Sequence, residues 1–205
     1  MKTLLKNLKE KLQDRKATAT ILKLTEMNLD KSLSYLEDLE EARTIFTKAS
    51  QVTQTQLSKQ ISEIVSSALD AVSFPYTFVV EFVQRRNTTE ADLWFEKNGK
   101  RKKPLDSCGY GAADIASLAL RVAYWKLDGE ARNVAVLDEP FRNLDKERLP
   151  LASMMVKNLS KMKGGLQFLI VTHNKALAAS ADKVFMVTKK NDVSSVVEIE
   201  NNLLT

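Results

Sequence analysis

Residues 134–140 read Val-Ala-Val-Leu-Asp-Glu-Pro, and residues 169–174 read Leu-Ile-Val-Thr-His-Asn. Each run is apolar until it ends in side chains that can do chemistry, Asp138 and Glu139 in the first and His173 in the second. Continuous apolar runs of this length are typical of strands in a parallel sheet that is buried on both faces. Together the two strand ends predict a site for phosphate hydrolysis, with a metal and a general base at one end and an imidazole at the other.

The surrounding pattern alternates between strands and helices. A glycine-containing loop at 106–111 leads directly into a strong helix. Strands that alternate with helices pair in parallel, so we expect an α/β sheet, mostly parallel, with flanking helices. Upstream, residues 76–83 predict a strand, and Asn98-Gly99 predicts the turn of a hairpin. The expected helices cover 112–127, about 146–162 and about 174–180, and the expected strands of this half cover 133–137, 166–171, 183–188 and 195–200.

Residues 1–72 contain neither glycine nor proline. From Leu8 to Leu36, a 3-4 spacing places apolar side chains at seven of nine positions, which is the period of a coiled coil over about four heptads. A second apolar face begins at Leu57. We therefore expect a long helix or helix pair that forms a coiled-coil arm over 1–72, followed by a lobe over 73–205. The alternative is an ordinary amphipathic helix packed on its own domain.

The bulk composition is that of a globular protein. The chain has 205 residues, 44% of them hydrophobic and 28% charged, which suffices for one domain with a helical extension. Its only cysteine, Cys108, fits a reducing compartment. No run approaches the ~20 apolar residues of a membrane span, and no secretory signal is evident, so we expect a cytoplasmic location and no membrane partner. The net charge is +5, and the basic run at 97–103 would either meet a phosphate backbone or face water.

Several polar residues carry candidate chemistry. Asp138 can hold Mg²⁺ through its water shell, and Glu139 can orient or deprotonate a water molecule. His173 is expected at the same sheet edge, where an imidazole can bind a γ-phosphate or the attacking water. The loop 106–111 exposes N–H groups at a helix N-terminus, which suits a phosphate. Asp145 is expected to be the N-cap of the next helix.

Each of these features also has a purely structural interpretation: an acidic turn before a helix, a bystander histidine, or an ordinary helix start. What the sequence lacks is also informative. A P-loop reads G-x-x-x-x-G-K-[ST], and among the six glycines only Gly99 precedes a lysine, which is followed by Arg101. The chain therefore has no P-loop. The cradle for a triphosphate must come from elsewhere, or ATP is not bound in the usual way.

This ordered set of motifs resembles the signature motif, Walker B motif, D-loop and switch histidine in the C-terminal half of an ABC-type ATPase head. With the arm in front, the chain is similar to the SMC-like and SbcC-like ATPases of DNA recombination and double-strand break repair, including those of bacteriophages. The resemblance covers roughly residues 75–190, and the arm fits 1–72. The matching motifs lie at 107–114, 134–140, 143–145 and 169–173.

The resemblance implies a role for each candidate residue. Asp138 would support Mg²⁺, Glu139 would be the general base, and His173 would contact the γ-phosphate. It also implies ATP and Mg²⁺ as cofactors, and four partners: a Walker A-bearing N-terminal lobe in the same or a separate chain, a second ATPase head, a nuclease subunit, and DNA. The location would be the cytoplasm, that of the host if the protein is viral, in association with the nucleoid. Ser107, Gly109 and Gly111 would present the signature loop to ATP on an opposing head, and Asp145 would communicate across the dimer interface.

The sequence departs from the family pattern in three ways: in the signature motif, in the D-loop, where Asn143 stands at a position at which serine is common, and in the N-terminal lobe. The usual signature is close to Leu-Ser-Gly-Gly-Gln/Glu, whereas residues 107–113 read Ser-Cys-Gly-Tyr-Gly-Ala-Ala, and counting back from the following helix puts Gly109 at the serine position. The Walker A lobe is missing, so the chain is a fragment, one half of a split ATPase, or a degenerate paralogue, and we expect it to be inactive alone. The rival hypothesis is a non-catalytic coiled-coil structural or interaction protein that keeps the ATPase domain as a scaffold. Retention of Glu139 and His173 favours catalysis, because packing requires neither residue.

Overall fold

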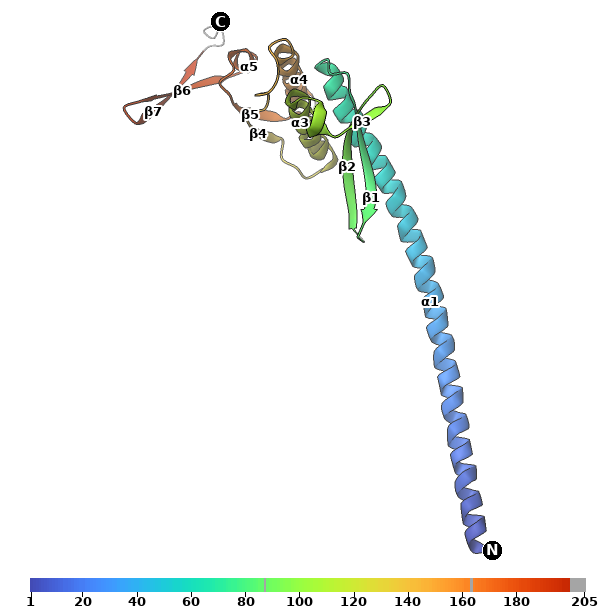
Figure 1. Cartoon of the computed structure of the whole chain (residues 1–205). Helices are drawn as coiled ribbons and strands as arrows, with labels where there is room; N and C mark the ends of the chain where they lie inside the picture. Colours follow the sequence, from blue (N-terminus) through green and yellow to red (C-terminus); the bar gives the residue numbers. More distant parts are fainter. Residues whose placement is uncertain (87, 163, 200–205) are drawn as a thin grey trace. The chain divides into compact units, whose positions relative to one another are not determined.

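The computed structural model describes residues 1–86, 88–162 and 164–199, and the side chain of Ser107 lies outside the description. The chain divides into two compact units, Met1–Thr53 and Gln54–Thr205. Figure 1 labels the helices and strands. In chain order they are α1 (Lys2–Ala71), β1 (Thr77–Arg85), β2 (Thr88–Lys97), β3 (Lys100–Lys102), α2 (Pro104–Ser107), α3 (Tyr110–Leu127), β4 (Val134–Asp138), α4 (Leu149–Lys161), β5 (Gln167–Val171), α5 (Lys175–Ala179), β6 (Val184–Lys190) and β7 (Val193–Ile199).

The first unit is the N-terminal part of α1, which is one continuous helix rather than a helix pair. The leucines of the predicted seam are exposed: Leu8, Leu22 and Leu36 each expose more than half of their surface. Exposed leucines at heptad spacing are the surface that a second helix covers in a coiled coil. None of the described helices combines the length and the apolarity that a membrane crossing needs.

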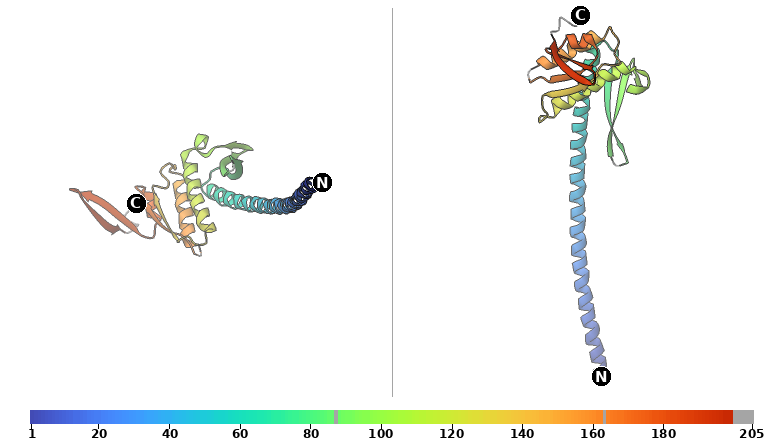
Figure 2. Two further views of the ribbon diagram at one scale, coloured as in Figure 1. Left: turned by 90° about the horizontal axis from the view of Figure 1, so that it is seen from below. Right: turned by 90° about the vertical axis from the view of Figure 1, so that its left-hand side faces the viewer.

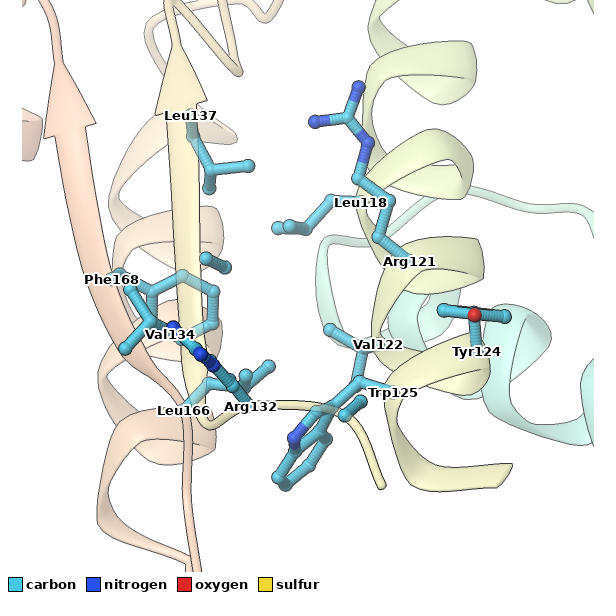
Figure 3. A pocket seen from close by; sticks show the side chains of 12 residues that line it. Leu118, Arg121, Val122, Tyr124, Trp125, Arg132, Val134, Leu137, Leu166 and Phe168 are labelled. Atoms are coloured by element: carbon cyan, nitrogen blue, oxygen red, sulfur yellow. The ribbon is translucent and has the colours of Figure 1, made fainter. Parts of the chain in front are cut away.

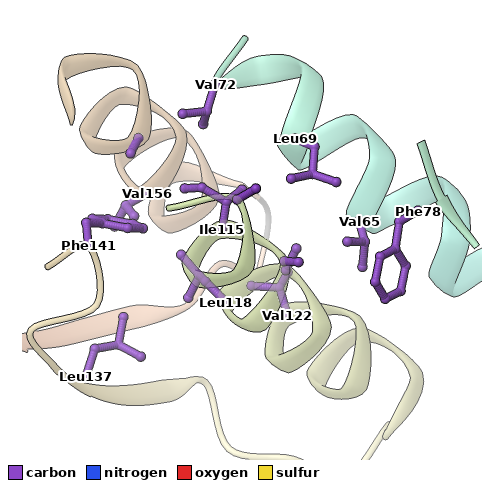
Figure 4. Close-up of a cluster of buried hydrophobic side chains, with 14 of the residues drawn as sticks. Val65, Leu69, Val72, Phe78, Ile115, Leu118, Val122, Leu137, Phe141 and Val156 are labelled. Atoms are coloured by element: carbon purple, nitrogen blue, oxygen red, sulfur yellow. The ribbon is translucent and has the colours of Figure 1, made fainter. Parts of the chain in front are cut away.

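The core of the second unit gathers side chains from the last turns of α1, from β1 and β2, and from α3 and α4 (Figure 4). Val65 and Leu69 of α1 and Ile115 of α3 are fully buried. On α3 the buried positions recur every three or four residues, which gives one apolar stripe along the helix. Complete burial of a side chain such as Leu69 stabilises the fold by about 1.5–3 kcal/mol.

Three serines of α1 dock β1 onto the helix. Ser58, Ser62 and Ser66 are spaced by four residues and therefore share one helix face. The backbone N–H of Phe78 donates to Ser66 Oγ over 2.9 Å, and the N–H of Val80 donates to Ser62 Oγ over 3.1 Å. The Ser58 hydroxyl donates to the carbonyl of Val80. These side chains satisfy backbone groups of β1 that its partner strand β2 does not reach.

The first sheet is an antiparallel arrangement in the order β1-β2-β3. Its second turn is the predicted Asn-Gly turn, because Asn98 and Gly99 have φ angles of 52° and 71°, the left-handed values that a type I′ hairpin requires. Phe95 of β2 is fully buried; its ring stacks on Tyr76 with centroids 5.4 Å apart and meets Phe78 edge-on at 5.7 Å. The predicted hairpin is therefore confirmed, and aromatic packing fixes it to the core.

The strands β4 and β5 pair in parallel, as the alternating pattern predicts. The expectation that this sheet is buried on both faces is wrong for the described chain. Leu137 is buried on one face, whereas Val136 is 65% exposed and Leu169 is 59% exposed on the other. Residues of a strand alternate between its two faces, so one entire apolar face of the β4–β5 pair is open. An apolar run predicts that the side chains on both faces of a strand are buried. In this chain, α3 and α4 bury only one face of the β4–β5 pair.

The last two strands form an antiparallel hairpin, β6–β7 (Figures 1 and 2). The turn uses Asn191 and Asp192 with φ angles of 51° and 60°. The final strand was expected at 195–200; it begins at Val193, and its predicted last residue, Glu200, lies outside the described residues. In the part of the chain that the structure describes, β6 pairs with β7 alone, so the parallel pattern is limited to β4 and β5.

Candidate functional site

The Glu139 carboxylate lies at the C-terminal ends of both parallel strands. The register pairs Asp138 with Val171, and the N–H of Glu139 donates to the carbonyl of Val171 over 2.9 Å. Glu139 Oε1 accepts the backbone N–H of His173 at 2.8 Å and lies 2.7 Å from the ring Nδ1 of His173. Oε2 accepts the hydroxyl of Thr172 at 3.1 Å. The two polar strand ends that the sequence singled out therefore meet through direct hydrogen bonds.

The charge and backbone of Glu139 fit a prepared site. The hydrogen bond from the His173 ring is the largest effect lowering the pKa of the Glu139 carboxyl, and partial burial opposes it. An ionised carboxylate only accepts hydrogen bonds, so Nδ1 of His173 carries the proton between them. The φ angle of Glu139 is 43°, in the left-handed region that costs a residue other than glycine of order 1–3 kcal/mol. The bonds to Thr172 and His173 hold the residue there.

Asp138 is the last residue of β4 and is exposed on the open face of the strand pair, which also carries Val136 and Val171. Among the described residues, no group of three or more histidine, cysteine, aspartate and glutamate side chains could hold a metal ion. A single exposed carboxylate nevertheless fits Mg²⁺, which is commonly held by one or two carboxylates together with substrate phosphates and water. Asp138 therefore suits a metal that arrives with a nucleotide.

The loop before α3 presents backbone rather than side chains. Gly109 is the N-cap of this 18-residue helix, with a φ angle of 81°, and has open space where a Cβ would lie. The first turn of α3 contains no acidic residue, so the positive end of the helix dipole is not neutralised there. The thiol of Cys108 is buried and faces Tyr76. Ser107 ends α2, and its predicted contact with ATP falls on a side chain outside the described part of the structure.

Gly111 and Asp114 join α3 to the loop that follows Glu139. A Cβ on Gly111 would lie 2.9 Å from the backbone carbonyl oxygen of Asn143, so only glycine permits this approach. The N–H of Asn143 donates to Asp114 Oδ2 over 3.1 Å, and the Asn143 side-chain amide donates to the same carboxylate. Gly111 thus has a packing reason to be glycine, and its predicted contact with ATP stays a prediction.

Asp145 stabilises the turn that leads into α4. Its Oδ1 accepts the backbone N–H of Arg148 at 2.9 Å, and this bond is the first cause of the lowered pKa of the Asp145 carboxyl. The Arg148 guanidinium donates to Oδ2 and lies over the ring of Phe74. The regular helix begins at Leu149, later than predicted, so Asp145 caps the turn before the helix rather than the helix itself. Pro150 occupies the first turn of α4 and suits a helix start there.

The predicted residues thus fall into two groups. Asp138 and the hydrogen-bonded pair Glu139 and His173 lie at the ends of β4 and β5. Gly111 lies against the loop 143–145. Sequence reasoning did not single out Thr172, Asp114 or Asn143 as contacts. Thr172 could have been found because it precedes His173, but nothing in the sequence marks Asp114 as a partner of a residue 29 positions away.

A pocket lies between the C-terminal half of α3 and the beginnings of β4 and β5 (Figure 3). Its lining is mainly apolar, with Arg121 and Arg132 contributing cations, and the indole N–H of Trp125 donates to Asn133 Oδ1 over 3.0 Å. Neither a carboxylate nor a histidine lines this pocket as described. The pocket therefore lacks an acid–base pair, and the candidate chemistry lies at the opposite ends of the strands.

The close approach of Gly111 to Asn143 gives a testable prediction. Gly111→Ala is expected to lower the free energy of unfolding by about 1–3 kcal/mol, because the added methyl group overlaps a backbone oxygen. The matched control is Gly129→Ala, where a Cβ meets open space, with an expected change within about 0.5 kcal/mol. Urea denaturation of both variants measures the difference. Equal stability of the two variants would contradict the packing role of Gly111.

The hydrogen bonds to Glu139 predict a pH dependence of stability. Because they lower the pKa of Glu139 in the folded chain, the ionised group stabilises the fold above the ordinary glutamate pKa of about 4.3, and this contribution is lost as the pH falls through the lower folded-state value. Glu139→Gln should therefore be less stable than the wild type at neutral pH, with a gap that narrows as the pH falls below the ordinary glutamate pKa and through the lower folded-state pKa. Urea denaturation across this pH range tests it, and a gap that does not change with pH would argue against the prediction.

Two curated sequence relatives are similar to this chain. It is 33% identical over 101 residues to the chromosome partition protein Smc of Methanocaldococcus jannaschii, a match that covers 49% of this chain and 8% of the relative. It is 24% identical over 147 residues to the DNA double-strand break repair Rad50 ATPase of Saccharolobus solfataricus, covering 71% of this chain and 17% of the relative. The chain thus spans less than a fifth of the length of either relative. No protein-family model matches it.

Solved structures show the same fold. The Smc head domain with a coiled coil and joint from Pyrococcus yayanosii matches with a TM-score of 0.63 and 19% identity, over 81% of this chain and 31% of that one. A structure from work on ATP-driven dimerization and DNA-stimulated activation of SMC ATPases matches with a TM-score of 0.59 and 21% identity, over 74% of this chain and 90% of that one. Sequence relatives and structural neighbours agree: the chain is similar in sequence to segments of Smc and Rad50 proteins, and its fold is that of SMC head domains, α/β with a long N-terminal helix.

Proposed function

We propose that this chain supplies the Walker B and signature side of an ATPase that acts in DNA recombination or double-strand break repair, in the cytoplasm and on nucleoid DNA. It hydrolyses ATP at a composite interface once a lobe with a Walker A motif is supplied. The observation that carries the proposal is the Glu139 carboxylate, which three donors from Thr172 and His173 hold at the ends of two parallel strands. Catalytic sites of open α/β sheets lie at this edge.

Each candidate residue has a separate role in the proposed hydrolysis of ATP. Asp138 would hold Mg²⁺, and the ion would supply positive charge that offsets the negative charge of the phosphates. Glu139, which its hydrogen bonds keep ionised, orients the attacking water and accepts its proton. His173, whose side chain is 79% exposed, would lie beside the γ-phosphate, where its second ring nitrogen can accept a hydrogen bond from the attacking water. Gly109 and the N-terminus of α3 present N–H groups to the nucleotide of an opposing head.

The open apolar surfaces support a missing partner lobe. Val136, Leu169 and Val171 each expose more than half of their area on one face of β4 and β5. The hairpin β6–β7 also exposes apolar side chains, including Phe185, Val187 and Val196. Isolated two-stranded hairpins are marginally stable in water, and large exposed apolar patches mark interaction sites. The lobe that carries Walker A would cover these surfaces.

Two further contacts follow from the proposal. ATP between two heads would draw their signature loops onto each other's nucleotides, and Asp145 would transmit the state of one site to the other. The exposed leucine seam of α1 would pair with a second helix in a coiled-coil arm. Hydrolysis would switch the heads between engaged and open forms and so regulate a nuclease subunit.

The decisive test is ATP turnover with and without a contiguous or co-encoded Walker A lobe. We expect the isolated chain to be inactive and the completed head to hydrolyse ATP. Glu139→Gln should lower kcat of the completed head by about 100- to 10,000-fold while ATP binding persists. Glu130→Gln, a glutamate in the exposed turn after α3, is the matched control. A completed head that binds no ATP, or one in which Glu139→Gln turns over normally, would instead support the non-catalytic scaffold.

The lysines around β3 are the proposed contact with the DNA backbone. Lys100, Lys102 and Lys103 are exposed and form no salt bridge among the described residues, whereas Arg101 is held by Glu81 and Glu96. Each Lys–phosphate contact releases counterions and adds about 0.9 to the slope of log affinity against log salt. Lys97, the other lysine of this hairpin, places its ammonium over the ring of Tyr76 instead.

Changing Lys100, Lys102 and Lys103 to glutamine should weaken duplex DNA binding and lower the salt slope by up to about 3. The matched control changes three exposed lysines of α4 and α5 to glutamine, which alters the net charge by the same amount: Lys157, Lys161 and Lys175. Fluorescence anisotropy over a salt series measures both. If the two triple variants lose the same affinity and slope, net charge alone explains binding and β3 is not the contact.

A further inference from the structure

The hydroxyl of Thr172 links Glu139 to the start of α5. Thr172 Oγ1 accepts the backbone N–H of Asn174 at 3.1 Å and lies 3.1 Å from Glu139 Oε2. A hydroxyl has one proton, and an ionised carboxylate can only accept, so the direction of both bonds is fixed. The Thr172 proton points at Oε2.

The two oxygens of the Glu139 carboxylate are consequently not equivalent. Oε1 meets two donors of His173, the backbone N–H at 2.8 Å and ring Nδ1 at 2.7 Å. Oε2 meets one donor, Thr172. A carboxylate oxygen offers about two lone-pair directions, so Oε1 is fully used and Oε2 has one left.

We infer that Thr172 is a positioning residue that aims Glu139, so that Oε2 is the oxygen that receives the proton of the attacking water. The inference rests on the proposed function and specifies its base. As the water oxygen bonds to the γ-phosphorus, one O–H bond of the water breaks and its proton goes to the free lone pair of Oε2. The bond from phosphorus to the β–γ bridging oxygen breaks, and ADP leaves with the electron pair.

Thr172 is held in place by its hydrogen bond to Asn174 at the capped start of α5, whereas the ring of His173 is exposed. Asn174 caps α5 through its side-chain oxygen, which accepts the N–H groups of Ala176 and Leu177, and Leu177 is buried. The Glu139 side chain is 27% exposed and that of His173 is 79% exposed, so packing leaves the imidazole free to move. With ring Nδ1 and the backbone N–H of His173 both on Oε1, the bond from Thr172 fixes Oε2 and leaves its remaining lone pair open.

The first experiment compares Thr172→Val and Thr172→Ser in the completed head. Valine keeps the shape but removes the donor, so kcat should fall about 10- to 100-fold with KM for ATP within about twofold. Serine restores the hydroxyl and should recover most of kcat. The matched control is Thr89→Val, which removes a strand hydroxyl that bonds to Gln84 far from Glu139 in the sequence. Normal kcat in Thr172→Val, or no recovery with serine, would overturn the inference.

A second measurement uses the 205-residue chain without ATP. The backbone N–H of His173 is protected by Oε1 only while Glu139 is held in place. Hydrogen exchange followed by NMR should therefore show about tenfold faster exchange of this amide in Thr172→Val, and wild-type exchange in Thr172→Ser and Thr89→Val. Unchanged exchange in Thr172→Val would overturn the positioning role. Faster exchange together with an inactive completed wild-type head would retain that role while refuting the proposed ATPase.

Discussion

The parallel register of β4 and β5 is the constraint on which the site depends. Pairing of Asp138 with Val171 brings the next residue of each strand, Glu139 and Thr172, to the same sheet edge. A shift of one residue would turn every side chain to the opposite face and separate the carboxylate from its donors. The left-handed backbone of Glu139 then returns its carboxylate toward β5, where the donors of Thr172 and His173 offset the conformational cost. The three hydrogen bonds therefore hold the Glu139 carboxylate in one position before any ligand binds.

The loop after Glu139 connects this site to helix α3. Phe141, only two residues on, is buried in the core and fixes the middle of the loop. Asn143 is then held from α3 by the carboxylate of Asp114 and by the close approach of Gly111. In the proposed dimer of heads, Glu139 and the loop before α3 would contact different nucleotides. Within this chain, the short packed segment from Phe141 to Asn143 joins them. Such segments transmit small shifts because packed cores resist continuous deformation.

Much of the fold was predictable because its signals are local. The apolar runs predicted β4 and β5, and the Asn98-Gly99 pair predicted the hairpin turn. The absence of glycine and proline predicted the long helix α1. Contacts between distant residues were not predictable. The four-residue spacing of the α1 serines gives them one helix face but does not identify β1 as their partner, and nothing in the sequence links Asp114 to Asn143. The meeting of Glu139 with His173 could be anticipated because parallel strands end at one edge, yet the role of Thr172 required the directions of its hydrogen bonds.

The exposed face of β4 links the proposed binding of a partner lobe to the proposed metal ligand Asp138. Val134, Val136 and Asp138 alternate along β4 and share its open face. A lobe that covers the two valines must also approach Asp138, since successive residues on this face of the strand lie about 7 Å apart. Exclusion of water would strengthen the attraction between this carboxylate and a cation, because the local dielectric constant falls. If the proposed partner lobe covers this face, assembly of the head would therefore also strengthen the binding of a cation by Asp138.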